Sequence, residues 1–143
     1  MKVSIGSDHA GVSLKSKAVA WLETNGYTVT DHGPFSEDSV DYPDFGHPVA
    51  SDVESNTSEL GVVICGSGNG INMTVNKHQG IRGALCWNTE LAALARQHNN
   101  ANVLSLPARF VDEEEGIKIL AAFFNASFEG GRHDRRVQKI RCS

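Results

Sequence analysis

Short apolar runs alternate with helical patterns along the whole chain. The clearest run, residues 60–65, is apolar on both faces, which is typical of a central strand in a parallel sheet. Four more runs rich in β-forming residues predict four further strands, at residues 2–6, 27–30, 81–86 and 102–106.

Helical patterns fill the segments between these runs. Leu14, Ala18 and Leu22 fall on one face of a helix that ends near Gly26. Further helices are predicted over residues 45–55, 71–76 and 90–97 and from 113 onward, with Asn88 and Asp112 placed to cap the last two. A chain of 143 residues has room for one domain with a single core, residues 1–143, and two domains would be cramped.

Strict alternation of strands and helices predicts an α/β fold with a doubly wound parallel sheet, helices on both faces and a C-terminal helical tail. For five strands we expect the Rossmann-like order 2-1-3-4-5, with its switch point between strands 1 and 3. Ligands of such folds bind beside that point, at the carboxyl ends of the strands. Residues 7–9 and 65–70 should therefore meet there.

Composition narrows the class of protein. Hydrophobic residues make up 40% and charged residues 21%, as in an ordinary soluble protein. No apolar run approaches the roughly 20 residues that span a bilayer, and the N-terminus has no signal-peptide pattern, so we expect a cytoplasmic protein with no membrane partner. The net charge of −4 argues against nucleic acid as a partner. Three widely spaced cysteines predict neither a disulfide framework nor a zinc site.

A glycine-rich loop, residues 66–70, follows the central strand and opens a helix. Its glycines let the backbone turn tightly and present successive N–H groups to an anion. The spacing excludes a P-loop and the dinucleotide fingerprint, and Asn72 stands where a Cys-x5-Arg phosphatase needs arginine. An anion site is favoured, and a tight connection without a ligand is the alternative.

Cys65 ends the buried strand where this loop begins. The loop amides and the helix end would stabilise a thiolate there. Such a group can remove a proton from carbon while the amides hold the oxyanion that develops. Cysteine is usually a small buried hydrophobic residue, and we interpret Cys86 and Cys142 in that way.

Further polar groups are candidates for the same site. Asp8 and His9 follow the first strand and can hold a sugar or move hydroxyl protons, or serve only as a helix cap and a loop residue. His98, at the end of the helix before the fifth strand, should approach the sheet edge, although alone it reads as a structural residue favoured by the helix dipole. Arg132 and Arg136 are four residues apart, so a helical tail would place both on one face, where paired guanidinium groups match a phosphate.

These segments together resemble the ribose-5-phosphate isomerase B family, which also includes the galactose-6-phosphate isomerase subunits. The resemblance runs nearly end to end, through Gly6-Ser7-Asp8-His9-Ala10-Gly11, Asp41-Tyr42-Pro43, Cys65-Gly66-Ser67-Gly68-Asn69-Gly70, Asn76-Lys77, Gly80-Ile81-Arg82, Arg96-Gln97-His98-Asn99, Asn102-Val103-Leu104 and Glu129-Gly130-Gly131-Arg132-His133. The family often has threonine where this chain has Ser67, and both residues carry a hydroxyl.

The resemblance implies reversible isomerisation of ribose 5-phosphate and ribulose 5-phosphate through an enediolate. It implies that Cys65 is the base and that His98 opens the furanose ring, with Asp8 and Ser67 completing the catalytic set. The implied binding residues are Gly66, Ser67, Gly68, Asn69 and Gly70 for the enediolate, Asp8, His9 and Asn99 for the sugar, and Arg109, Arg132 and Arg136 for the phosphate. No cofactor or metal is implied, and family members are dimers or tetramers of dimers with sites shared across an interface.

Other functions stay open from sequence alone. The substrate could be a hexose 6-phosphate of the allose or galactose type. The same fold could also carry a non-catalytic module that binds a phosphate ligand. Nucleic-acid binding by the arginine-rich tail is a more distant alternative.

Overall fold

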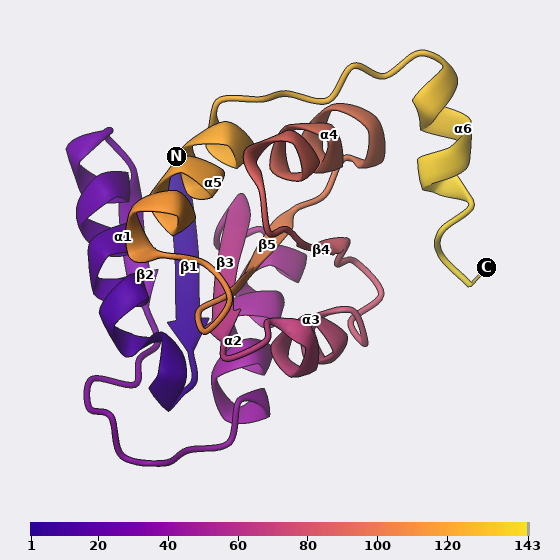
Figure 1. Cartoon of the computed structure of the whole chain (residues 1–143). Helices are drawn as coiled ribbons and strands as arrows, with labels where there is room; N and C mark the ends of the chain where they lie inside the picture. Colours follow the sequence, from indigo (N-terminus) through magenta and orange to yellow (C-terminus); the bar gives the residue numbers. More distant parts are fainter. Residues whose placement is uncertain (143) are drawn as a thin grey trace.

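A five-stranded parallel sheet crosses the molecule, and helices cover both of its faces (Figure 1). This computed structural model describes residues 1–142. The strands are β1 (Lys2–Ser7), β2 (Thr28–Asp31), β3 (Leu60–Cys65), β4 (Gly83–Leu85) and β5 (Val103–Pro107). The helices are the short η1 (His9–Gly11), α1 (Val12–Thr24), α2 (Pro43–Glu54), α3 (Asn69–Val75), α4 (Thr89–Asn99), α5 (Glu113–Phe124) and α6 (Arg132–Gln138).

The strand order is β2-β1-β3-β5-β4. The doubly wound parallel sheet and the neighbouring positions of β1 and β3 are therefore confirmed, but the predicted order 2-1-3-4-5 was wrong for the last two strands. Burial explains the exchange, because every residue of β5 is buried while β4 is three residues long and only half-buried. A strand that is apolar on both faces belongs inside the sheet, and the weaker strand takes the edge.

Two apolar clusters hold the layers together. On one face, side chains of α1, α4 and α5 pack against residues such as Ile5, Ile64 and Leu104. On the other, α2 and α3 pack against Val63 and Cys65. The predicted base therefore points to the face that α2 and α3 cover.

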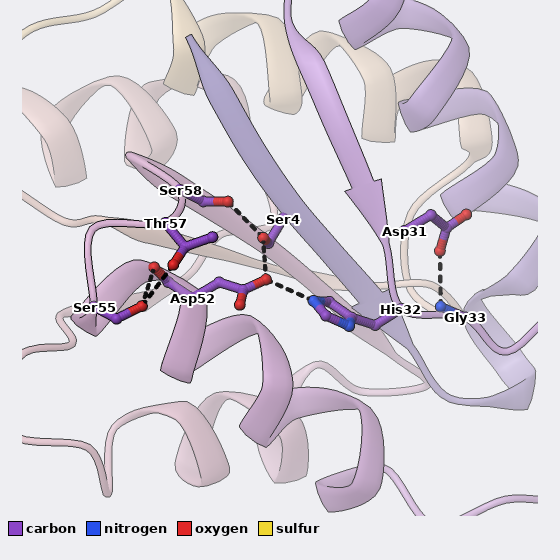
Figure 2. Close-up of polar contacts among 8 residues, drawn as sticks. All are labelled: Ser4, Asp31, His32, Gly33, Asp52, Ser55, Thr57 and Ser58. Atoms are coloured by element: carbon purple, nitrogen blue, oxygen red, sulfur yellow. Dashed lines mark hydrogen bonds and ion pairs between the residues drawn. The ribbon is translucent and has the colours of Figure 1, made fainter.

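A polar cluster fixes α2 to the sheet (Figure 2). The Ser4 hydroxyl, fully buried on β1, donates to Asp52 Oδ2 at 2.7 Å, and Ser58 lies 2.6 Å from the same hydroxyl. His32 Nε2 lies 2.7 Å from that carboxylate oxygen. The carboxylate thus stands between hydroxyl and imidazole, whereas a Ser-His-Asp triad needs the imidazole in the middle. We interpret the cluster as an anchor for α2.

The helices are all short. The longest in the described part of the chain, α1, has 13 residues, and none there has the length and apolar character needed to cross a membrane.

Candidate active site

A cavity of about 450 Å³ opens where β1, β3 and β5 end. It is lined by Asp8, Tyr42, Cys65, Gly66, Ser67, Gly70, Arg109 and Phe110. The backbone N–H of Asp8 donates to the carbonyl of Ile64 at 3.0 Å, which fixes the end of β1 against the end of β3. The predicted meeting of residues 7–9 with residues 65–70 is confirmed.

Cys65 is the last residue of β3, and it is 4% exposed. Its carbonyl accepts from the N–H of Ala108, and that of Gly66 accepts from Arg109, each at 2.9 Å. These bonds bring the end of β5 to the head of the glycine loop. Arg109 reaches the cavity because it follows β5, and β5 lies directly beside β3 in the sheet.

Cys86 shows a different environment for the same side chain. It is buried, and desolvation raises the pKa of its thiol to about 12. A thiol with that pKa stays protonated near neutral pH, so Cys86 packs as a small hydrophobic residue, as predicted.

At each glycine of the loop, a side chain from another segment lies close to where a Cβ would stand. Gly68 has φ +75°, and a Cβ there would lie 2.5 Å from the Leu85 side chain. A Cβ on Gly70 would lie 2.5 Å from the ring of Tyr42. The Arg109 side chain occupies the space beside Gly66, 3.2 Å from where a Cβ would stand. Two of the side chains that shape the loop, Tyr42 and Arg109, also line the cavity.

Ser67 and Asp8 present polar groups to this cavity. The Ser67 hydroxyl oxygen accepts from the N–H of Asn69 at 3.2 Å, so its own proton can be donated elsewhere. Asp8 Oδ1 accepts from the N–H of Ala10 at 2.9 Å, capping the short η1 helix. Asp8 therefore combines the cap and the cavity position, which the sequence had left as alternatives.

His9 lies at the start of η1 and does not line the cavity. Its Nδ1 accepts a hydrogen bond of 3.2 Å from the N–H of Val40. Accepting at Nδ1 places the imidazole proton on Nε2. The contact also fastens the segment between β2 and α2 beside the end of β1.

Tyr42 and Phe110 were not predicted as site residues. Tyr42 stands directly before Pro43, the first residue of α2, and so near the carboxyl edge of the sheet. The motif Asp41-Tyr42-Pro43 was the available signal, because a proline at a helix start fixes where the preceding side chain lies. Phe110 follows Arg109 and is 76% exposed, which is unusual for an aromatic ring beside a polar cavity.

The remaining predicted residues lie elsewhere in this chain. His98 and Asn99 end α4, directly before β5, and do not line the cavity. The carbonyl of Asn102 there accepts from the N–H of Gly61 near the start of β3, so this is the amino edge of the sheet. A strand as long as β3 spans roughly 20 Å. Within one chain, His98 and Cys65 thus belong to opposite edges.

Arg132 and Arg136 lie on α6, which packs beside α4 (Figure 1). Arg136 Nη1 donates to the carbonyl of Arg132 at 3.2 Å, in agreement with the prediction that both occupy one helical face. Neither arginine lines the cavity of its own chain. The N–H of Glu129 donates to the carbonyl of Gln97 at 3.0 Å and ties the segment before α6 to α4.

His98 belongs to a cluster with Glu129 and His133. Glu129 Oε1 lies 3.7 Å from His98 Nε2 and 3.8 Å from His133 Nε2. The two rings stack with centroids 4.2 Å apart and planes 14° from parallel. Partial desolvation and the neighbouring charges of His98 and Arg132 hold the pKa of His133 below its ordinary value. Mixed nitrogen and oxygen donors of this kind can hold a metal ion.

Comparison with known proteins places this geometry in a family. The model of the ribose/galactose isomerase family matches residues 3–140. A probable ribose-5-phosphate isomerase B of Mycoplasma pneumoniae is 48% identical over 139 residues, 96% of this chain and 91% of the relative. Ribose-5-phosphate isomerase B of Escherichia coli is 41% identical over 139 residues, 97% of this chain and 93% of the relative.

Solved structures agree with this relationship. Ribose-5-phosphate isomerase B of Clostridium thermocellum superimposes with a TM-score of 0.96 at 46% identity, covering 98% of this chain and 95% of that one. The Mycoplasma genitalium enzyme, solved with bound ribulose 5-phosphate, gives a TM-score of 0.94 at 48% identity and covers 97% of this chain and 93% of its own.

Proposed function

Because this chain belongs to the ribose/galactose isomerase family, we propose that it is an aldose–ketose isomerase that interconverts ribose 5-phosphate and ribulose 5-phosphate. The observation that carries the proposal is the position of Cys65, at the head of a glycine loop in a cavity that also holds Asp8 and Arg109. An isomerase of this kind acts in carbohydrate metabolism, in the pentose phosphate pathway.

Cys65 is the base in the proposed reaction. Its thiolate removes the proton from C2 of the open-chain aldose, and the electron pair left on C2 forms the enediolate with C1. The thiol then returns the proton to C1 while the O2 hydroxyl proton passes to O1, which gives the ketose and regenerates the thiolate. Proton removal from carbon at neutral pH is slow without such a base, and a positioned one contributes typically ~10²–10⁴ in rate.

The loop after Cys65 stabilises the enediolate oxygens. The first N–H groups of a helix have no acceptor within the helix, so those that follow Asn69 in the first turn of α3 are available to an oxyanion, while that of Asn69 donates to Ser67. The Ser67 hydroxyl still has a proton to donate. Asp8 and His9 hold the sugar hydroxyls, and Asn99 joins them from a second copy of the chain, because it lies away from the cavity of its own chain. No cofactor is needed, because the net change is a shift of two hydrogens, from C2 to C1 and from O2 to O1, with no external oxidant or reductant.

The phosphate end needs positive charge, and Arg109 supplies it from within the cavity. Arg132 and Arg136 complete the phosphate site, and His98 opens the ring. Since these three residues lie away from the cavity of their own chain, they reach the cavity of a second copy. The protein is then a homodimer, or a tetramer of dimers, with two-chain sites, and it works in the cytoplasm.

A solvent-exchange experiment tests this function. Ribose 5-phosphate incubated with the enzyme in deuterated water should become labelled at carbon and form ribulose 5-phosphate, as NMR will show. Cys65→Ala should abolish both events and still bind the sugar phosphate, whereas the control Cys86→Ala should retain them. Near-normal activity of Cys65→Ala would overturn the assignment of the base.

The same assay separates the alternatives. Kinetics on ribose 5-phosphate beside allose and galactose 6-phosphates would reveal a hexose preference. A binding module would be stabilised against heat by the ligand without any exchange.

A further inference from the structure

The cluster of His98, Glu129 and His133 combines one carboxylate and two imidazoles. In the described residues, 1–142, it is the one group of three such side chains whose ligand atoms all lie within 4.8 Å of one another. Glu129 Oε1 lies 3.7 Å from Nε2 of His98 and 3.8 Å from Nε2 of His133. These distances are too long for hydrogen bonds, so the three groups face one another without bonding directly.

The spacing fits a small divalent ion. Zinc binds imidazole nitrogen and carboxylate oxygen at about 2.1 Å, so two ligands in a tetrahedron are about 3.4 Å apart. The two observed distances exceed this value by only a few tenths of an ångström, but the imidazoles are stacked almost parallel, so one ring must turn before both Nε2 lone pairs point at one ion. Glu129 is 53% and His98 37% exposed, so Glu129 can move inward and His98 can turn out of the stack to admit an ion.

Backbone contacts hold the three ligands near one another. Glu129 is tied through its N–H to Gln97, the residue before His98. His133 lies four residues after Glu129, near the start of α6, and its side chain is 13% exposed. The site therefore joins the end of α4 to the start of α6.

We propose that His98, Glu129 and His133 bind a divalent transition-metal ion of the Zn²⁺ class. Two imidazole nitrogens and one carboxylate oxygen favour such an ion over Mg²⁺ or Ca²⁺, which prefer all-oxygen sites. Three protein ligands leave a fourth position for water. Arg132 and Arg136 on the same helix repel a cation, so binding is reversible rather than structural.

The proposal has a consequence for catalysis, which rests on the proposed function. The ring-opening role of His98 requires a nitrogen that can accept and donate a proton. A metal ion occupies the Nε2 lone pair and removes that ability. Zinc-class ions therefore inhibit the isomerase through His98, and a chelator restores it.

Calorimetry on the full chain, stripped of metal, tests the binding. Zn²⁺ should bind the wild-type protein, and Glu129→Gln and His133→Asn should each weaken that binding at least ~10-fold, because loss even of a residue that only supports a ligand costs about that much. The control is His47→Asn. His47 Nδ1 lies 2.7 Å from His78 Nε2, but that bond and one from His78 to Glu54 leave no shared position for an ion, so Zn²⁺ affinity should not change.

A second measurement needs no variant. Paramagnetic Co²⁺ added to the wild-type protein should broaden the imidazole NMR signals of His98 and His133 before those of His47 and His78. Broadening of the latter pair first, or equal zinc affinity in all variants, would overturn the site.

Activity is measured separately. Zinc should lower turnover of the wild-type protein, and a chelator should restore it. In His133→Asn, the zinc concentration for half-inhibition should rise at least ~10-fold. Zinc binding without isomerase activity would reject the proposed function alone, and activity without zinc binding would reject this inference alone.

Discussion

The N–H of Asp8 donates to the carbonyl of Ile64, and this one bond sets Asp8 beside Cys65 at the carboxyl edge of the sheet. The parallel register of β1 and β3 makes the contact unavoidable, because Ser7 pairs with Ile64. No comparable contact joins His98 to Cys65 in the described chain, since α4 ends at the opposite edge. A site that uses both residues must combine two copies.

Mixing two inactive variants tests this shared site. Cys65→Ala and His98→Asn, each with a different tag, are refolded together and the doubly tagged dimer is isolated. One of its two sites then contains both wild-type groups, so about half of the wild-type activity should return. A doubly tagged dimer as inactive as its parents would place both groups of a site in the same chain.

The part of the site that follows from strand order could be predicted from sequence. The apolar run ending at Cys65 identifies the central strand, and the switch-point rule then pairs it with the strand before Asp8. The exchange of β4 and β5 was missed because a hydrophobic pattern shows that a strand is buried, not which strand it pairs with. Arg82 and Gly83 in the fourth run were the available signs of an edge strand.

Contacts that depend on packing between distant segments could not be predicted from the sequence. Tyr42 meets Gly70 because α2 packs beside α3 on the sheet, where an apolar cluster and the polar cluster around Asp52 both hold it. His98 and His133 stack only because the segment before α6 returns to α4. In both cases the relevant spacing is set by tertiary structure, which neither strand nor helix periodicity encodes.

Alanine substitution should distinguish Arg136, which we propose binds the phosphate, from its neighbour Arg135. Arg136→Ala loses charge-assisted hydrogen bonds to the phosphate, so kcat/KM for ribose 5-phosphate should fall ~10–100-fold. Arg135→Ala removes the same charge from the same helix and should change little, because adjacent residues of a helix point about 100° apart and Arg135 therefore does not share the direction of Arg136. Equal losses in both variants would indicate general electrostatic attraction instead of a phosphate site.

Gly70→Ala should disturb the active site more than the fold. The new Cβ would stand 2.5 Å from the Tyr42 ring, which is 40% exposed and can turn outward. The ring would then leave the cavity wall, and kcat/KM should fall ~10–100-fold, because small misplacements near reacting atoms are costly. Thermal unfolding should change little. Tyr42→Ala as a second change removes the clash, so the double variant should be no worse than Tyr42→Ala alone.

Asp52 should make stability depend on pH in the acid range. Burial alone would raise the pKa of Asp52, but hydrogen bonds from Ser4 and His32 outweigh it and hold the pKa below its ordinary value of 3.8. The folded state therefore binds this proton less readily than the unfolded state does. The stabilisation is complete above pH 3.8 and is lost as pH falls through the lower, folded pKa.

Urea unfolding of the wild-type protein beside Asp52→Asn measures this contribution. Near neutral pH the variant should be less stable by about 2 kcal/mol, the usual value of hydrogen bonds to a charged group. The gap should narrow as pH falls below 3.8, since both proteins then carry a neutral side chain at position 52. Ser4→Ala serves as the matched control, because it removes a single donor to the same carboxylate and should give a smaller gap with the same pH dependence. A gap that stays constant from neutral to acid pH would show that the charge of Asp52 does not stabilise the anchor of α2.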